Sequence, residues 1–227
     1  MSKPVLKVIS QGCAANFGEG EKIARLLQDK YNVSFGLFDK EGSVNGQGEP
    51  VDAYVLNVCT VKGNASAIKL LKQAREQSPE AAIYVTGCAP KDLKLEVARI
   101  DPGVVFTSLT ELSTGTAPMN VSSASDKPSV LREAPLVGIV NIEEGCLDAC
   151  AYCSTRLVKG RLHSFPAIAI VEQIKQFVSD GCREIQLTGQ DCGCYGFDLG
   201  SNLAELVQKI LVDVPGDYRI RLGMGNP

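Results

Sequence analysis

Short apolar runs alternate with longer segments of helical periodicity along residues 1–112. The runs have the length of buried strands, and the segments after them carry hydrophobic residues at helical spacing. The strand-like runs are 5–9, 53–58 and 81–86. The helical segments that follow them are, in the same order, 16–29, 61–77 and 90–99. Strands that alternate with helices build a parallel sheet covered by helices. The pattern therefore predicts an α/β domain over residues 1–112.

A stretch rich in serine, proline and small residues follows this domain. Residues 113–135 have the composition of a linker. Beyond it the strand-like runs are 135–142, 183–188 and 218–222, and the helical segments between them are 166–180 and 203–212. Three strands separated by helices are the start of a barrel or of an open sheet. We predict that residues 136–227 form the first half of such a barrel.

Composition and charge narrow the class of protein. Of 227 residues, 44% are hydrophobic and 22% charged, which is typical of a folded protein. The chain has no apolar run long enough for a signal peptide or a membrane span, so we expect a cytoplasmic protein without a membrane partner. Basic and acidic residues number 13 and 13 up to Leu112, and 10 and 13 beyond it. Neither part has the basic surplus of a self-sufficient nucleic-acid binder.

The nine cysteines point to metal or redox chemistry. Nine is an odd number, and thiols stay reduced in the cytoplasm, so a disulfide framework is not expected. Three of them, Cys13, Cys59 and Cys88, come directly after predicted strands. Functional residues of an open parallel sheet lie in the loops at the carboxyl ends of its strands. The three cysteines are therefore candidates for one site.

A second set has a tighter spacing. Cys146, Cys150 and Cys153 form a C-x3-C-x2-C loop after a predicted strand. Three thiolates hold three irons of a [4Fe–4S] cube and leave the fourth iron open, where the amino and carboxylate groups of S-adenosylmethionine can chelate it. The alternative is a zinc site, but zinc takes four protein ligands, usually from C-x2-C pairs, and the one histidine, His163, lies outside this spacing.

Residues near this loop are candidates for cofactor contacts. Tyr152 either packs against the adenine of the cofactor or forms a wall of the loop. The second predicted strand ends in a segment whose backbone carbonyls and carboxylate suit the cofactor's ammonium group, since active sites of barrels gather at the carboxyl ends of strands. That segment is Thr188, Gly189, Gln190 and Asp191.

Three basic residues follow the cysteine loop. Arg156, Lys159 and Arg161 either meet RNA phosphates or the cofactor carboxylate, or simply lie in solvent. Three further cysteines remain. Cys182 is expected to be a small buried hydrophobic residue, whereas Cys192 and Cys194 lie beside the predicted cofactor segment without an assigned role.

Several motifs together resemble a known family. They are Asn-Val-Cys-Thr-Val-Lys, Val-Gly-Ile-Val-Asn-Ile before Gly-Cys-Leu, Leu-Thr-Gly-Gln-Asp-Cys-Gly-Cys-Tyr-Gly and Arg-Leu-Gly-Met-Gly-Asn-Pro. Over essentially its whole length the chain is similar to radical S-adenosylmethionine methylthiotransferases, most closely to the archaeal and eukaryotic branch. The resemblance implies a flavodoxin-like first domain with a second [4Fe–4S] cluster on Cys13, Cys59 and Cys88. One S-adenosylmethionine would supply a methyl group and another the 5′-deoxyadenosyl radical.

The resemblance also implies a substrate and partners. The branch methylthiolates C2 of N6-threonylcarbamoyladenosine beside the anticodon of tRNA, with a reducing electron donor protein and a sulfur donor. Related branches act on isopentenyladenosine in tRNA or on an aspartate of a ribosomal protein. Family members complete the barrel and add an RNA-binding TRAM domain, so we expect a longer chain or a second polypeptide to supply these parts. The alternative is a non-catalytic iron–sulfur or assembly subunit.

Overall fold

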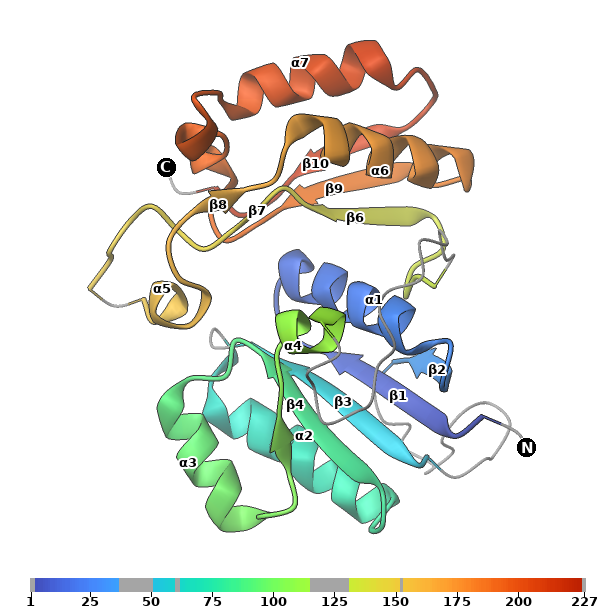
Figure 1. Ribbon diagram of the computed structural model, residues 1–227, viewed down its shortest axis with the longest axis vertical. Helices are drawn as coiled ribbons and strands as arrows, with labels where there is room; N and C mark the ends of the chain where they lie inside the picture. The colour runs from blue at the N-terminus through green and yellow to red at the C-terminus, as the bar shows by residue number, and fades with distance from the viewer. Residues whose placement is uncertain (1–2, 37–50, 60–61, 115–130, 152, 226–227) are drawn as a thin grey trace. The chain divides into compact units, whose positions relative to one another are not determined.

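The computed structural model describes residues 3–36, 51–59, 62–114, 131–151 and 153–225. Figure 1 shows the chain, which divides into two compact units, Met1–Glu133 and Ala134–Pro227. Within the described ranges, none of the helices combines the length and the apolar character that crossing a bilayer requires. Each unit has its own parallel sheet and its own hydrophobic core.

The first unit contains a five-stranded parallel sheet. Its strands are β1 (Val5–Ser10), β2 (Asn32–Phe35), β3 (Ala53–Val58), β4 (Ala82–Gly87) and β5 (Val105–Phe106). They lie in the order β2-β1-β3-β4-β5, and every pair is parallel. This order is that of flavodoxin-like folds, whose ligand-binding crevice lies at the switch point between β1 and β3. The predicted α/β, flavodoxin-like class is therefore confirmed.

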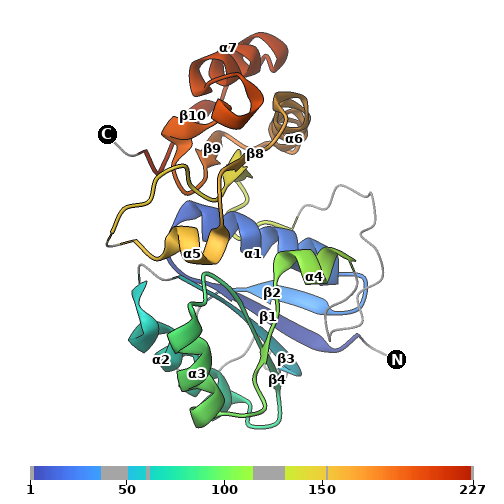
Figure 2. The same cartoon turned by 60° about the vertical axis from the view of Figure 1, so that its left-hand side comes forward.

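Helices cover both faces of this sheet. They are α1 (Ala14–Leu27), α2 (Asn64–Gln77), α3 (Lys91–Ile100) and α4 (Leu109–Thr114). Figures 1 and 2 show α1 and α4 on one face and α2 and α3 on the other. Every residue of β1 and β3 is buried because these central strands have a helix layer on each side. Their unbroken apolar runs follow from that double burial.

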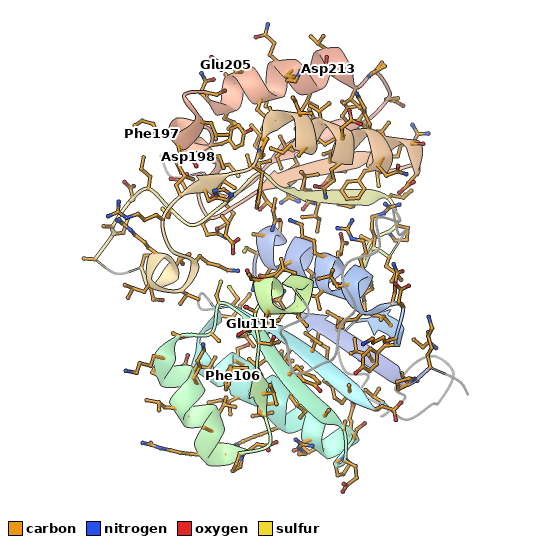
Figure 3. The ribbon with its side chains drawn as sticks, in the orientation of Figure 1. Phe106, Glu111, Phe197, Asp198, Glu205 and Asp213 are labelled. Carbon is orange, nitrogen blue, oxygen red and sulfur yellow. The ribbon has the colours of Figure 1, made fainter. Side chains whose placement is uncertain are left out.

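Helix α4 has its own start signal. The Ser108 backbone N–H donates to Oε2 of Glu111 over 2.7 Å, and the Glu111 N–H donates to Ser108 Oγ over 3.2 Å. This reciprocal pair is a capping box, and Figure 3 labels Glu111. The helix continues to Thr114, two residues into the segment predicted as linker, and 115–130 lie outside the described residues.

The second unit contains a three-stranded parallel sheet. Its strands β6 (Val137–Asn141), β9 (Glu184–Thr188) and β10 (Arg219–Leu222) lie side by side in chain order. Helices α6 (Ala167–Ser179) and α7 (Leu203–Asp213) pack against each other, and α6 also contacts β6 (Figure 1). Sequential parallel strands joined by helices on one face are the first steps of a β/α barrel, as predicted.

Short elements surround the carboxyl ends of these strands. They are the antiparallel pair β7 (Glu143–Glu144) and β8 (His163–Ser164), helix α5 (Thr155–Lys159), and the 3₁₀ turns η2 (Cys192–Cys194) and η3 (Phe197–Leu199). Figure 3 labels Phe197 and Asp198 on η3. Oδ2 of Asp198 accepts the backbone N–H of Ser164 over 2.8 Å, which ties η3 to β8. The sequence pattern did not predict these elements because each spans five residues or fewer.

Candidate iron–sulfur and cofactor sites

Three cysteines lie at the carboxyl ends of three adjacent strands in the first unit. Cys13 follows β1 and caps the start of α1, Cys59 follows β3, and Cys88 follows β4. Because β3 is hydrogen-bonded to β1 on one side and to β4 on the other, the three loops are neighbours. The sheet thus brings together residues that are 46 and 29 positions apart in the sequence.

The side chain of Asn16 lies between two of these cysteines. Its Oδ1 is 3.8 Å from the sulfur of Cys13 and also 3.8 Å from the sulfur of Cys88. The two sulfurs are therefore within twice that distance of each other. The thiol of Cys13 is also hydrogen-bonded to Cys59. The structure accordingly places the thiols of Cys13 and Cys88 at one buried side chain, since Asn16 is 1% exposed, and Cys59 joins them through Cys13.

Backbone hydrogen bonds fix this arrangement. The carbonyl of Val58 accepts Nδ2 of Asn16 over 2.8 Å and the backbone N–H of Cys88 over 2.9 Å. In return Nδ2 of Asn57 donates to the carbonyl of Asn16 over 2.6 Å. The end of β3 therefore holds both the start of α1 and the loop after β4, which carry the other two cysteines.

A row of buried polar side chains lies just before the cysteines. Ser10, Asn57 and Thr86 are register partners on β1, β3 and β4, so they share one face of the sheet. Their Oγ, Oδ1 and Oγ1 atoms are buried and have no hydrogen-bond partner among the described residues. Buried polar atoms without partners are rare in folded proteins, and they are often found where a bound group belongs.

The Cys13 thiol ionises less readily than an ordinary cysteine. The hydrogen bond to Cys59, followed by burial, raises the pKa of Cys13 well above its ordinary range. The thiol stays protonated at neutral pH, so iron binding must release its proton. Sulfur donors from three loops and a polar surrounding therefore suit an iron–sulfur cluster, which takes cysteine thiolates.

The second set of cysteines lies in a loop of the second unit, residues 145–153, called the cysteine loop below. The N–H of Cys146 donates to the carbonyl of Gly160 over 3.3 Å, and Cys146 forms an isolated β-bridge with Arg161. A turn closes the loop, since the N–H of Cys153 donates to the carbonyl of Cys150 over 3.0 Å. The backbone of Cys146 thus anchors the start of the loop, and an internal turn shapes its end.

The thiols of Cys146 and Cys153 have pKa values shifted in opposite directions. Burial raises the pKa of Cys146. Hydrogen bonds from the side chain and then from the backbone of Thr155 lower the pKa of Cys153, which is exposed. An exposed thiol with a lowered pKa is the one that reaches the thiolate form first and binds a metal most readily.

The predicted cofactor segment lies next to the cysteine loop. Oε1 of Gln190 accepts the backbone N–H of Gly145 over 2.7 Å, so the two loops touch. Thr188 is fully buried, and its Oγ1 has no partner within the described part of the chain. Oδ1 of Asp191 accepts the N–H of Gly193 over 3.1 Å and thereby starts the η2 turn.

Glu143 belongs to this site, although the sequence reasoning did not select it. It is 1% exposed, and its Oε1 accepts the backbone N–H of Asp191 over 2.9 Å. Burial raises the pKa of this carboxyl to about 7, against the lowering effect of the N–H groups of Asp191 and Gln190. The sequence does not distinguish Glu143 from the neighbouring Glu144, because the burial of Glu143 and its bond to Asp191 arise only in the fold.

The three basic residues lie on or just after helix α5. Arg156 and Lys159 lie on α5, where Nη1 of Arg156 donates to the carbonyl of Asp148 over 3.1 Å. Lys159 pairs with Glu144 over 3.3 Å, and its side chain is 8% exposed, so its charge is already matched. Arg161 contributes its backbone to the bridge with Cys146. Tyr152 lies outside the described residues.

The surplus cysteines separate into a core residue and two residues near the site. Cys182 is 2% exposed, which confirms the prediction that it is buried. Cys192 is equally buried, and the thiol of Cys194 donates to the carbonyl of Asp191 over 3.0 Å. All nine cysteines are free thiols.

The two cysteine sets do not form a site for a single ion. Across the described ranges, no three or more His, Cys, Asp or Glu side chains are grouped so as to hold a metal ion. A lone zinc ion needs its ligands around one point. The thiolates of a cube bind different irons, so a cluster does not require its ligands to surround a single point.

Comparison with known proteins agrees with this geometry. Residues 6–107 match the model of the Uncharacterized protein family UPF0004. The chain is 31% identical, over 95% of its length, to a probable threonylcarbamoyladenosine tRNA methylthiotransferase of Methanothermobacter thermautotrophicus. It is 33% identical to a probable threonylcarbamoyladenosine tRNA methylthiotransferase of Pyrococcus horikoshii. It is 31% identical to the threonylcarbamoyladenosine tRNA methylthiotransferase of Homo sapiens, and both matches again cover 95% of the chain. The chain is therefore similar in sequence to these methylthiotransferases over nearly all of its own length. The family resemblance predicted from the motifs is confirmed.

The relationship covers part of the relatives' length. The chain spans 52% of each of the two archaeal proteins and 39% of the human one. Among solved structures it is similar to TsrM of Kitasatospora setae, a radical S-adenosylmethionine methyltransferase with cobalamin and a [4Fe–4S] cluster bound. The TM-score is 0.56 at 11% identity, covering 92% of this chain and 52% of that one, which supports the fold.

Proposed function

We propose that this chain provides two [4Fe–4S] sites and the cofactor segment of a tRNA methylthiotransferase. The proposed product is the 2-methylthio form of N6-threonylcarbamoyladenosine, the substrate named for the relatives. The observation that carries the proposal is the placement of two cysteine triads at strand ends, in a chain similar to these relatives over 95% of its length. Two triads allow a division of labour.

The residues have distinct roles in this proposal. Thiolates of Cys146, Cys150 and Cys153 hold the cluster that binds S-adenosylmethionine, because their loop touches the 188–191 segment through Gln190. Within that segment Thr188, Gly189 and Asp191 surround the cofactor. The thiolates of Cys13, Cys59 and Cys88 hold the auxiliary cluster, at which the incoming sulfur binds. When bound, these groups supply the radical and sulfur chemistry that an unreactive aromatic C–H bond requires and polar side chains lack.

The remaining assignments also belong to the proposal. The proposed domains are 1–112 with the auxiliary cluster, a linker at 113–135, and the barrel part at 136–227. An electron donor protein and a sulfur donor act in the cytoplasm, with Arg156, Arg161 and Tyr152 as candidates for RNA or cofactor contacts. A second polypeptide that binds this chain is a further candidate source of the remaining barrel strands.

The first test separates the two triads. The reconstituted chain is incubated anaerobically with S-adenosylmethionine and a strong reductant, and 5′-deoxyadenosine is measured by chromatography. We expect cleavage to disappear when Cys146, Cys150 and Cys153 are replaced by alanine. It should persist when Cys13, Cys59 and Cys88 are replaced. Equal loss in both folded triple variants contradicts the division of roles.

The second test addresses the substrate. The chain, alone and joined to a segment equivalent to the rest of an archaeal relative, is incubated with tRNA that contains threonylcarbamoyladenosine. Nucleosides are then analysed by mass spectrometry. We expect methylthiolated product from the longer protein, because the substrate must be held close to the radical and shielded from water. Parallel incubations contain isopentenyladenosine tRNA or the ribosomal protein, and product from one of these alone would contradict the proposed substrate. Iron binding without any cofactor cleavage would favour an assembly subunit.

A further inference from the structure

Two loops of the second unit exchange side-chain hydrogen bonds. Glu143 stands just before the cysteine loop, and its Oε1 accepts the backbone N–H of Asp191 over 2.9 Å. Gln190 stands in the 188–191 segment, and its Oε1 accepts the backbone N–H of Gly145 over 2.7 Å. One side chain from β7 therefore holds the 188–191 segment, and one side chain from that segment holds the start of the cysteine loop. The backbone adds a third link, since the N–H of Ile142 donates to the carbonyl of Thr188 over 2.8 Å.

Gly189 fits closely against this arrangement. A Cβ atom built on Gly189 would overlap the carboxylate of Glu143. The φ angle of Gly189 is not in the left-handed region, so the glycine is needed for space and not for its conformational freedom. The carboxylate of Glu143 thus occupies the volume that a side chain at position 189 would fill.

The two side chains differ in their surroundings. Glu143 is 1% exposed, and its Oε2 has no hydrogen-bond partner among the residues that the structure describes. Keeping a carboxyl at such a position costs free energy, and burial raises its pKa to about 7. A carboxyl accepts the Asp191 N–H in either protonation state. Glu143 can therefore hold the backbone of Asp191 whichever form its carboxyl takes.

We propose that Glu143 and Gln190 are positioning residues that lock the cofactor segment to the cysteine loop. In this arrangement Gln190 acts on cofactor binding through Gly145, the residue before Cys146, and its amide oxygen does not contact the cofactor. The inference rests on the proposed function, because the two loops matter together when one holds the cluster and the other its cofactor. A brace between them would hold in register the two segments that bind the cluster and the cofactor.

The test uses the whole chain with Cys13, Cys59 and Cys88 replaced by alanine, so that one cluster is observed. Electron paramagnetic resonance of the reduced cluster is recorded without and with S-adenosylmethionine, and equilibrium dialysis gives the affinity. Gln190→Met keeps the length of the side chain and removes the strong acceptor. Glu143→Leu removes the other acceptor, whereas Glu143→Gln keeps it. Glu144→Gln is the matched control, since this neighbouring carboxylate is exposed and pairs with Lys159.

We expect Gln190→Met and Glu143→Leu to shift the cluster spectrum before any cofactor is added. Each substitution removes one hydrogen bond of the brace that links the 188–191 segment to the start of the cysteine loop. Each should weaken cofactor binding by about tenfold, the upper range for one hydrogen bond. The two losses should not multiply in the double variant, since either one opens the same brace. Glu143→Gln and Glu144→Gln should match the parent chain.

The contrary result is equally defined. If Gln190→Met leaves the cofactor-free spectrum unchanged and weakens binding, Gln190 contacts the cofactor directly and the brace is wrong. The same conclusion follows if the double variant loses cofactor affinity by the product of the two single losses. If Glu143→Leu does not fold, the spectrum of Gln190→Met and its affinity still decide. A parent chain that holds its cluster but binds no S-adenosylmethionine refutes the proposed function, while the cofactor-free spectra still test the brace.

Discussion

The central position of Asn16 leads to the most quantitative prediction. Asn16→Ala removes the hydrogen bond from Nδ2 to the carbonyl of Val58, 2.8 Å long, and the amide that lies 3.8 Å from two cysteine sulfurs. The Val58 carbonyl keeps its bond from the N–H of Cys88, and the backbone carbonyl of Asn16 keeps its bond from Asn57. The substitution therefore leaves no main-chain group without a partner.

The expected magnitude follows from these contacts. One net hydrogen bond contributes about 1 kcal/mol, and the void left by a buried side chain that is 1% exposed adds about 1 kcal/mol more. The first unit should lose about 2 kcal/mol of unfolding free energy. With an m-value of about 2 kcal/mol per molar urea, the midpoint falls by about 1 M. The cysteines also lose the side chain that spaces them.

The assay has two parts. Urea unfolding of the iron-free chain measures stability, and iron is counted after reconstitution in a background with Cys146, Cys150 and Cys153 replaced by alanine. Asn64→Ala is the control, since Asn64 also lies at a helix start but its bond to Asp92, 2.7 Å, is exposed. We expect the control to change stability by less than about 0.5 kcal/mol and to keep its iron. Equal behaviour of the two variants in both measurements would refute the role given to Asn16.

Three further predictions concern single positions. Gly87→Ala should lower the stability of the first unit in urea unfolding, and its iron content after reconstitution, more than Gly63→Ala does. Both glycines have positive φ, but a Cβ at Gly87 meets Asn57 and Val58, whereas a Cβ at Gly63 meets open space. Gly138→Ala should destabilise the second unit by clashing with Phe177, and adding Phe177→Leu should restore part of its unfolding free energy; no restoration contradicts the contact. In the iron-free chain at pH 8, iodoacetamide should modify Cys153 before Cys146, as measured by peptide mass spectrometry. Thr155 lowers the pKa of Cys153 and burial raises the pKa of Cys146, so the thiolate fraction is greater at Cys153. Raising the pH should narrow the difference between the two rates of modification.

Buried parallel strands were predictable from the sequence. The predicted and observed bounds of β3 coincide at Ala53–Val58, because a strand covered on both faces is apolar throughout. Strand β2 was not predicted, since this edge strand of four residues is partly exposed and includes Asn32 and Ser34. Strand β5 has two residues, which is too short to produce a pattern. Helix α4 extended into a segment whose small polar residues suggested a linker.

The candidate sites were predictable in part for the same reason. Strand ends locate loops, so the position of Cys13, Cys59 and Cys88 at one sheet edge followed from the order of elements. The roles of Asn16 and Glu143 did not follow, because their partners Val58 and Asp191 lie 42 and 48 positions away. Contacts between residues so far apart in the sequence depend on which strands become neighbours. The spacing of residues along one segment does not specify which strands these are.

The claim that two separate triads each hold a [4Fe–4S] cluster is tested most directly by counting iron and sulfide. The chain is reconstituted anaerobically, and its metal content is measured together with its Mössbauer spectrum. We predict about eight irons per chain, about four after alanine replacement of Cys13, Cys59 and Cys88, and about four after replacement of Cys146, Cys150 and Cys153. A folded chain that takes up zinc and resists iron, or that loses all its iron in either triple variant, would contradict the account.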